Sequence, residues 1–100
     1  MEKLFYLFAI VSKQGERSFR LRELVGGHSM SARLSRGVRT RSDKVGVLAE
    51  AVKNLRGKFY FDGIRVVFVP PDDLEESEKE RAKALTTEES EEAKRIIESN

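Results

Sequence analysis

The sequence predicts an α+β protein with three to four helices, a C-terminal β-hairpin and, after it, an acidic helical tail. Apolar residues recur with the period of a helix in the first half of the chain, most regularly over residues 43–56. The dipeptide Asp62-Gly63 lies between two apolar runs and is a preferred centre for a two-residue hairpin turn. Pro70-Pro71 then ends the hairpin, and acidic residues dominate the remainder of the chain.

Residues 2–14 favour an amphipathic helix, which Gly15 would end. Apolar residues follow the i, i+3, i+4, i+7 spacing of one helical face: Leu4, Leu7, Phe8 and Val11. A buried strand is the alternative, because apolar residues also fill the opposite face of such a helix. Residues 19–25 favour a second, short helix that ends at Gly26-Gly27.

Residues 28–42 form the most unusual segment, because they carry four arginines and no acidic residue. A helix from Ser29 would turn most of these arginines away from its apolar stripe, although Gly37 in its middle costs roughly 1 kcal/mol relative to alanine. A basic loop is the alternative. Solvated surfaces usually mix both signs of charge, so this segment indicates contact with an anion, and nucleic acid is the first expectation.

Residues 43–56 give the clearest helix, with Ser42 as its N-cap and Gly57 after its last turn. Residues 58–69 then form the hairpin. Its turn would direct one set of side chains toward solvent or a ligand: Lys58, Tyr60 and Arg65. A surface that combines cations with an aromatic ring is typical of proteins on which nucleic-acid bases stack.

The charge of the chain divides at Pro70-Pro71. Residues 1–70 hold 14 Lys and Arg against 6 Asp and Glu, a net charge of +8, whereas residues 71–100 hold 5 against 11, a net charge of −6. Two capping-box spacings predict acidic helices over residues 73–85 and 87–99. Because their apolar content is thin, we expect a basic domain followed by a tail that serves in dimerisation or in autoinhibition of the basic part.

Several classes of function are excluded by composition. Without cysteine the chain has no disulfide, no thiolate zinc site and no cysteine nucleophile. The acidic residues before position 71 show no metal-ligand spacing, and there is no glycine-rich phosphate loop. The sequence therefore predicts no catalysis, no metal, no cofactor and no small-molecule substrate. The longest apolar run has eight residues, which is too short for a transmembrane helix, and the absence of cysteine favours a cytoplasmic location.

The order of these elements resembles the winged helix-turn-helix superfamily. The segments that carry the resemblance are EKLFYLFAIVSKQG for its first helix, FRLRELVGG for its second helix and turn, SMSARLSRGVRTR for its recognition helix and FYFDGIRVVFV for its wing. The helix at residues 43–56 is a departure, because it is either an added element or itself the recognition helix. The resemblance implies a homodimeric transcriptional regulator that places a helix in the major groove of duplex DNA.

The expected nucleic-acid-binding residues are Arg20, Arg33, Arg36, Arg39, Arg41, Lys44, Lys58, Tyr60 and Arg65. Duplex DNA is favoured over RNA as the partner, and the protein would then be associated with the nucleoid. One alternative is a β-β-α-β-β module in which residues 4–11 and 17–23 pair as strands and residues 43–56 cover the sheet, with RNA or a ribosomal surface as the partner. Another is a protein-interaction module whose basic surface contacts an acidic protein.

Overall fold

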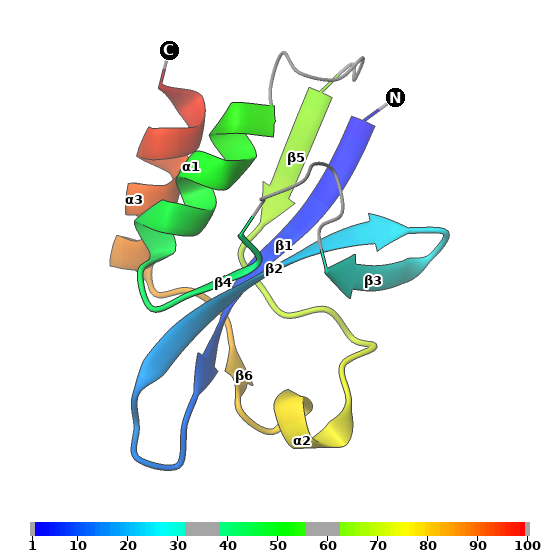
Figure 1. Cartoon of the computed structure of the whole chain (residues 1–100), viewed down its shortest axis with the longest axis vertical. Helices are drawn as coiled ribbons and strands as arrows, with labels where there is room; N and C mark the ends of the chain where they lie inside the picture. Colours follow the sequence, from blue (N-terminus) through cyan, green and yellow to red (C-terminus); the bar gives the residue numbers. More distant parts are fainter. Residues whose placement is uncertain (1, 32–38, 56–62, 100) are drawn as a thin grey trace.

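The chain folds into a six-stranded mixed sheet with three short helices. This computed structural model describes residues 2–31, 39–55 and 63–99. In chain order the elements are β1 (Glu2–Val11), β2 (Arg17–Val25), β3 (His28–Ser31), β4 (Arg41–Ser42), α1 (Val45–Leu55), β5 (Gly63–Val67), α2 (Glu76–Lys79), β6 (Ala82–Lys83) and α3 (Thr87–Glu98) (Figure 1).

β1 is a central strand of the sheet, in which neighbouring strands follow the order β3-β2-β1-β5. β1 and β2 form a long antiparallel hairpin that places Phe5 opposite Glu23 and Val11 opposite Arg17. β5 pairs with the other edge of β1 in the parallel sense. The two-residue strands β4 and β6 extend the sheet, β4 beside β2 and β6 beside β1. The sheet thus joins residues from almost the whole length of the chain.

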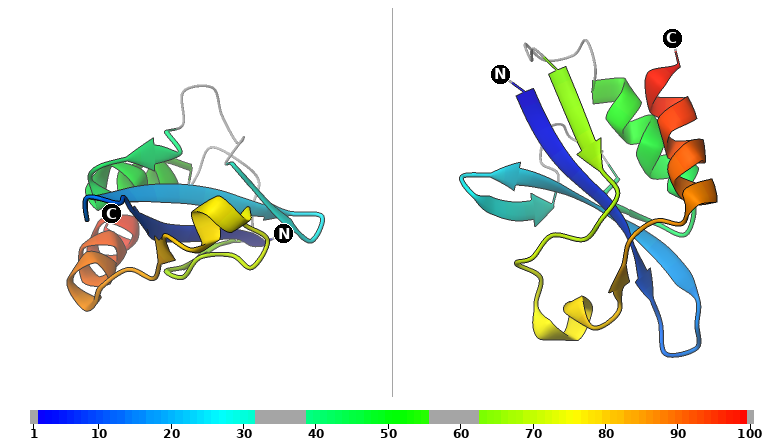
Figure 2. Two further views of the ribbon diagram at one scale, coloured as in Figure 1. Left: turned by 90° about the horizontal axis from the view of Figure 1, so that it is seen from below. Right: turned by 180° about the vertical axis from the view of Figure 1, so that it is seen from behind.

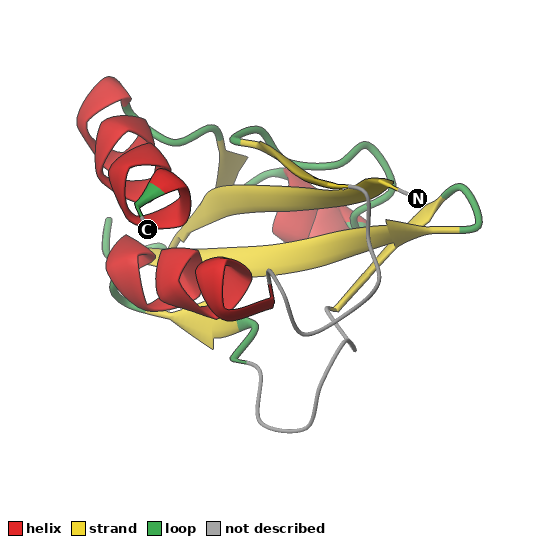
Figure 3. Cartoon of the chain, turned by 90° about the horizontal axis from the view of Figure 1, so that it is seen from above, coloured by secondary structure: helices red, strands yellow, loops and turns green. Residues whose placement is uncertain are grey.

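A helical layer covers one face of the sheet. Successive side chains of a strand point to opposite faces, so Phe5 and Leu7 of β1 share this face with Phe19 and Leu21 of β2. The helices α1 and α3 lie next to each other against it (Figures 1 and 3). They bury Val45, Leu48, Ala49, Val52 and Leu55 from α1, and Ala93 and Ile97 from α3. Full burial of one such large apolar side chain stabilises the fold by about 1.5–3 kcal/mol.

The opposite face of β1 carries a smaller apolar cluster. It consists of Phe8, Ile10 and Leu74, with Tyr6 and Ala82 packed against them. Leu74 belongs to residues 70–81, which leave the β5 side of the sheet, pass through α2 and return to β1 at β6 (Figure 2). We call residues 70–81 the strap. The sheet therefore has the helical layer on one face and the strap on the other.

The helices expected over residues 2–14 and 19–25 are wrong, because both segments are strands. The centre of β1 is buried on both faces, with Leu7 toward the helical layer and Phe8 toward the strap. A strand buried on both sides is a continuous apolar run, and such a run also satisfies helical spacing. The alternative strand pairing of residues 4–11 with residues 17–23 is confirmed, and α1 covers the sheet as that alternative expected.

The winged-helix architecture with an appended acidic tail is also wrong. β6 pairs with β1, and α3 packs on α1, so the acidic part of the chain completes the sheet and the core. The helix expected over residues 73–85 is reduced to the four residues of α2. The helix expected over residues 87–99 does form, as α3, and the predicted capping box of Thr86 and Glu89 is present. The local capping-box signal thus predicted this helix correctly, although α1, on which it packs, lies far away in the sequence.

The basic segment 28–42 does not begin or end in a recognition helix. Its described ends are β3 and β4, and both pair with β2. Residues 32–38 lie outside the described residues. The helix expected over residues 43–56 is confirmed as α1, which begins at Val45. Of the expected hairpin, the second strand is present as β5, whereas its first strand and turn up to residue 62 lie outside the described residues.

Two hydrogen bonds tie β2 to α3. Arg17 donates from Nε to Glu89 Oε2 at 3.0 Å and from Nη2 to Glu89 Oε1 at 2.6 Å. The backbone N–H of Thr86 donates to the same carboxylate at 2.9 Å. Burial opposes the ionisation of Glu89, but the bonds from Arg17 and Thr86 outweigh it and hold the pKa of Glu89 below its ordinary value.

We expect the protein to lose stability as the pH falls below the ordinary glutamate pKa of 4.5. Because the folded-state pKa of Glu89 is depressed, the unfolded chain binds more protons in this range, which favours unfolding. The contribution of Glu89 is complete above the unfolded-state pKa and is lost as the pH falls through the folded-state pKa. Thermal melting between pH 7 and pH 3 should show a steeper loss for the wild type than for Glu89→Gln. Parallel curves would contradict the expectation.

Candidate nucleic-acid interface

Arginines gather on the strap face of the sheet. Arg20 and Arg22 are two positions apart on β2, so both point away from the helical layer. Arg41 of β4 lies directly opposite Arg20 and shares its face. Arg81, at the end of the strap, lies close enough to Arg20 for its positive charge to lower the pKa of Arg20. We call Arg20, Arg22, Arg41 and Arg81 the arginine cluster.

Arg20 and Arg41 form a cross-strand pair of like charges. Two cations directly opposite each other on neighbouring strands destabilise a sheet. Among the described residues neither guanidinium has a carboxylate within ion-pair distance. Arg20 instead donates to the Ser18 hydroxyl at 3.2 Å and to the Phe19 carbonyl at 3.1 Å. Burial, and then the charge of Arg41, lower the pKa of Arg20, although arginine remains protonated in proteins.

One strap carboxylate among the described residues reaches the cluster. Arg22 donates from Nη2 to Glu78 Oε2 at 3.3 Å. Arg81 turns its Nε to the backbone carbonyl of Ser77 at 3.0 Å. Among the described residues, one ion pair with a carboxylate is therefore found for the four guanidinium groups of the cluster, and the excess positive charge suits an anion such as phosphate.

The structure brings two of the expected nucleic-acid-binding residues together, Arg20 and Arg41. Arg65 is exposed on the same face of the sheet, but β1 separates its strand from β2. Arg39 is exposed just before β4, and Lys44 is exposed just before α1. The other expected residues lie outside the described residues: Arg33, Arg36, Lys58 and Tyr60.

Two members of the cluster were missing from the sequence-based set, Arg22 and Arg81. Arg22 could have been found, because residues 19–22 alternate apolar and basic side chains, which is the period of a half-buried strand. No local pattern points to Arg81. It reaches the cluster because the strap returns to β1, where the Val11 N–H donates to its carbonyl at 2.9 Å.

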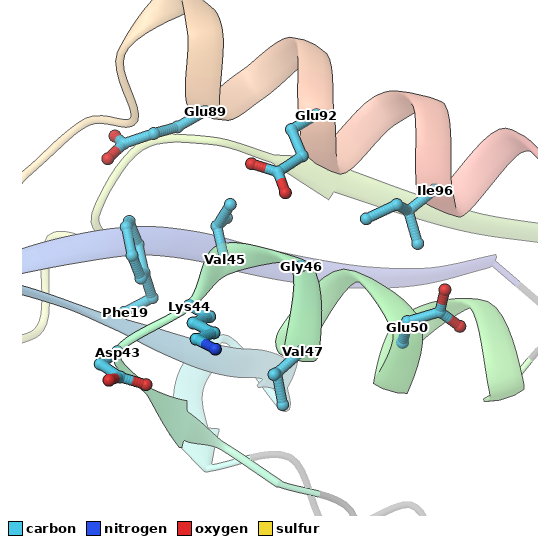
Figure 4. A pocket seen from close by; sticks show the side chains of 10 residues that line it. All are labelled: Phe19, Asp43, Lys44, Val45, Gly46, Val47, Glu50, Glu89, Glu92 and Ile96. Carbon is cyan, nitrogen blue, oxygen red and sulfur yellow. The ribbon is translucent and has the colours of Figure 1, made fainter.

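A groove lies between α1 and α3 (Figure 4). Its volume is about 570 Å³. Gly46 lines the groove without a side chain, and a Cβ at this position would lie 3.4 Å from Glu92 Oε1. Glu92 and Ile96 point from α3 toward α1 in Figure 4. The charged side chains that line the groove are Asp43, Lys44, Glu50, Glu89 and Glu92. This acidic lining repels a polyanion and places Lys44 in an environment different from that of the arginine cluster.

Within residues 2–31, 39–55 and 63–99, no three histidine or acidic side chains come together as a metal site would require. In the same ranges no helix has the length and apolar character that a membrane crossing demands. Comparison with known proteins gave no match to a family model, to a curated protein or to a solved structure.

Proposed function

We propose that this protein binds nucleic acid, without catalysing a reaction, through the arginine cluster. The observation that carries the proposal is the cross-strand pair of Arg20 and Arg41, whose charges repel each other and lack a carboxylate partner among the described residues. A phosphate bound between these two guanidinium groups would relieve that repulsion. Arginine is also the side chain best suited to hold phosphate oxygens through two parallel hydrogen bonds.

A single strand is the proposed form of the ligand, with RNA favoured. Both helices of the helical layer lie on the other face of the sheet, so neither accompanies the arginines toward a major groove. Sheet faces that bind nucleic acid commonly hold single strands laid across them, with cations on the phosphates. The proposal includes action in the cytoplasm, where such strands are accessible.

We expect a labelled oligouridylate to bind with an affinity that falls steeply between 50 and 200 mM salt, because bound phosphates release counterions. In the Arg20→Gln/Arg41→Gln double variant the affinity at 50 mM salt should fall by about tenfold per arginine, and the slope of log affinity against log salt should lessen by about 1.4. Fluorescence anisotropy across the salt series measures both quantities.

The matched control is the Lys13→Gln/Arg95→Gln double variant. It removes the same charge from two exposed positions, one in the β1–β2 turn and one on α3. If it weakens binding as much as the cluster variant does, binding follows total charge and the cluster is not the site. A wild-type affinity that does not change with salt, or no binding at 50 mM salt, overturns nucleic-acid binding itself. Tighter binding of duplex DNA than of oligouridylate overturns the preference for a single strand.

A further inference from the structure

The ion pair between the strap and the arginine cluster is a weak one. Arg22 and Glu78 meet through a single nitrogen–oxygen contact of 3.3 Å, and their side chains are 21 % and 27 % exposed. The pair is thus partly buried but still open to water, and a pair held by one such long contact contributes little to stability, because water competes for both groups. An anion that binds Arg22 through two hydrogen bonds can therefore replace the Glu78 carboxylate.

The strap is held at its two ends and loosely in its middle. Near its start, Leu74 is buried in the cluster of Phe8 and Ile10, and Asp73 accepts hydrogen bonds from the backbone N–H and the hydroxyl of Ser29. At its end the strap joins β1 through the carbonyl of Arg81. Between these attachments, α2 has no buried residue. The part of the strap that carries Glu78 can consequently move while its ends remain attached.

The carboxylate of Glu78 and a phosphate group present the same chemistry to a guanidinium group. Each offers two anionic oxygens, which arginine binds with its planar fork of N–H donors. The charge of Glu78 also favours the protonated form of Arg20, so it offsets part of the positive charge of the cluster beyond its direct partner Arg22. A phosphate in its place would offset the same positive charge, whereas a phosphate that approached Arg22 beside Glu78 would be repelled by that carboxylate.

We infer that Glu78 occupies a phosphate position of the arginine cluster, and that nucleic acid binds there by displacing this carboxylate together with α2. This inference rests on the proposed nucleic-acid binding. The ligand assigned to the position of the Glu78 carboxylate is a phosphodiester group. The strap then competes with nucleic acid for Arg22, and the charge of Glu78 sets the affinity of the site for nucleic acid.

The Glu78→Gln variant should bind oligouridylate about fivefold more tightly than the wild type, because the amide competes poorly for Arg22. The matched control is Glu76→Gln, which removes the same charge from an exposed position on the same short helix. It should change the affinity by less than about twofold, as expected of an exposed carboxylate that forms no ion pair with a described arginine of the cluster. In an Arg22→Gln background the Glu78→Gln effect should fall to the smaller effect of its charge on Arg20, because the directly paired guanidinium is absent.

The outcomes separate the two claims. If the wild type binds and Glu78→Gln binds no more tightly than Glu76→Gln, the displacement is overturned and the nucleic-acid function stands. If neither the wild type nor Glu78→Gln binds, the function is overturned, and the displacement with it. A purely structural role of Glu78 would lower the melting temperature of the variant without raising its affinity.

A measurement on the wild type alone covers the case in which Glu78→Gln does not fold. Hydrogen exchange of the α2 amides should become faster when oligouridylate is added, because a four-residue helix that has lost its contact with the sheet does not keep its internal hydrogen bonds, while the Val11 amide of the β1–β6 connection should keep its protection. Unchanged or slower exchange of the α2 amides on binding would overturn the displacement.

Discussion

The Ala93→Asp variant is expected to be largely unfolded at neutral pH. Ala93 is 0 % exposed and lies in the core cluster where α3 meets α1, among apolar side chains. The substitution places a charge where water cannot reach it, at a cost of several kcal/mol, and forces extra volume into a packed interface. A domain of this size is typically stable by about 5–15 kcal/mol, so the cost approaches the whole stability.

Far-ultraviolet circular dichroism and urea unfolding measure this effect, and Arg95→Asp is the control. Arg95 is exposed on the same helix, so this variant introduces the same side chain without burying it. It should unfold close to the wild-type midpoint. If Ala93→Asp also retained wild-type stability, α3 would be a peripheral tail and its place in the core would be contradicted.

The second large effect is expected at the ion pair between β1 and β2. Glu23 is 2 % exposed, and the Nζ of Lys3 lies 2.9 Å from its Oε1. Within the described part of the chain no hydrogen bond reaches this oxygen, so the nearby ammonium compensates its charge. The Lys3→Ala variant should lose about 3 kcal/mol of stability, because it leaves a buried carboxylate without that cation.

Urea unfolding of Lys3→Ala tests this expectation, with Lys13→Ala in the exposed β1–β2 turn as the control. The double variant Lys3→Met/Glu23→Met should recover most of the lost stability, because replacement of both charges by apolar groups removes the cost of burying them. A loss below about 1 kcal/mol in Lys3→Ala, as for a surface pair, would show that water or another group already compensates Glu23.

The charge division of the sequence at Pro70-Pro71 is not a division in space. Acidic residues from the second part of the chain reach both faces of the sheet. Glu89 binds Arg17 on the helical side, and Glu78 binds Arg22 on the strap side. The excess of positive charge that remains at the arginine cluster is therefore a property of the folded chain, and the proposed function rests on that excess.

The elements that could be predicted are those with local signals. α1 has a regular apolar period, and α3 has the capping box of Thr86 and Glu89, so short-range interactions determine both helices. β1 could not be assigned by pattern, because the strap covers the face that would otherwise be polar. The same cause hid one member of the site, because Arg81 becomes a neighbour of Arg20 only when the strap returns to the sheet.

The sequence by itself determined α1, α3 and the basic character of the first part of the chain, since these depend on neighbouring residues and on composition. Only the tertiary structure decided that residues 2–11 form a strand, that the acidic segment belongs to the core, and that Arg41 lies opposite Arg20. The physical reason is that strand pairing and burial on two faces are long-range interactions. They join residues tens of positions apart, and no local period or capping signal encodes them.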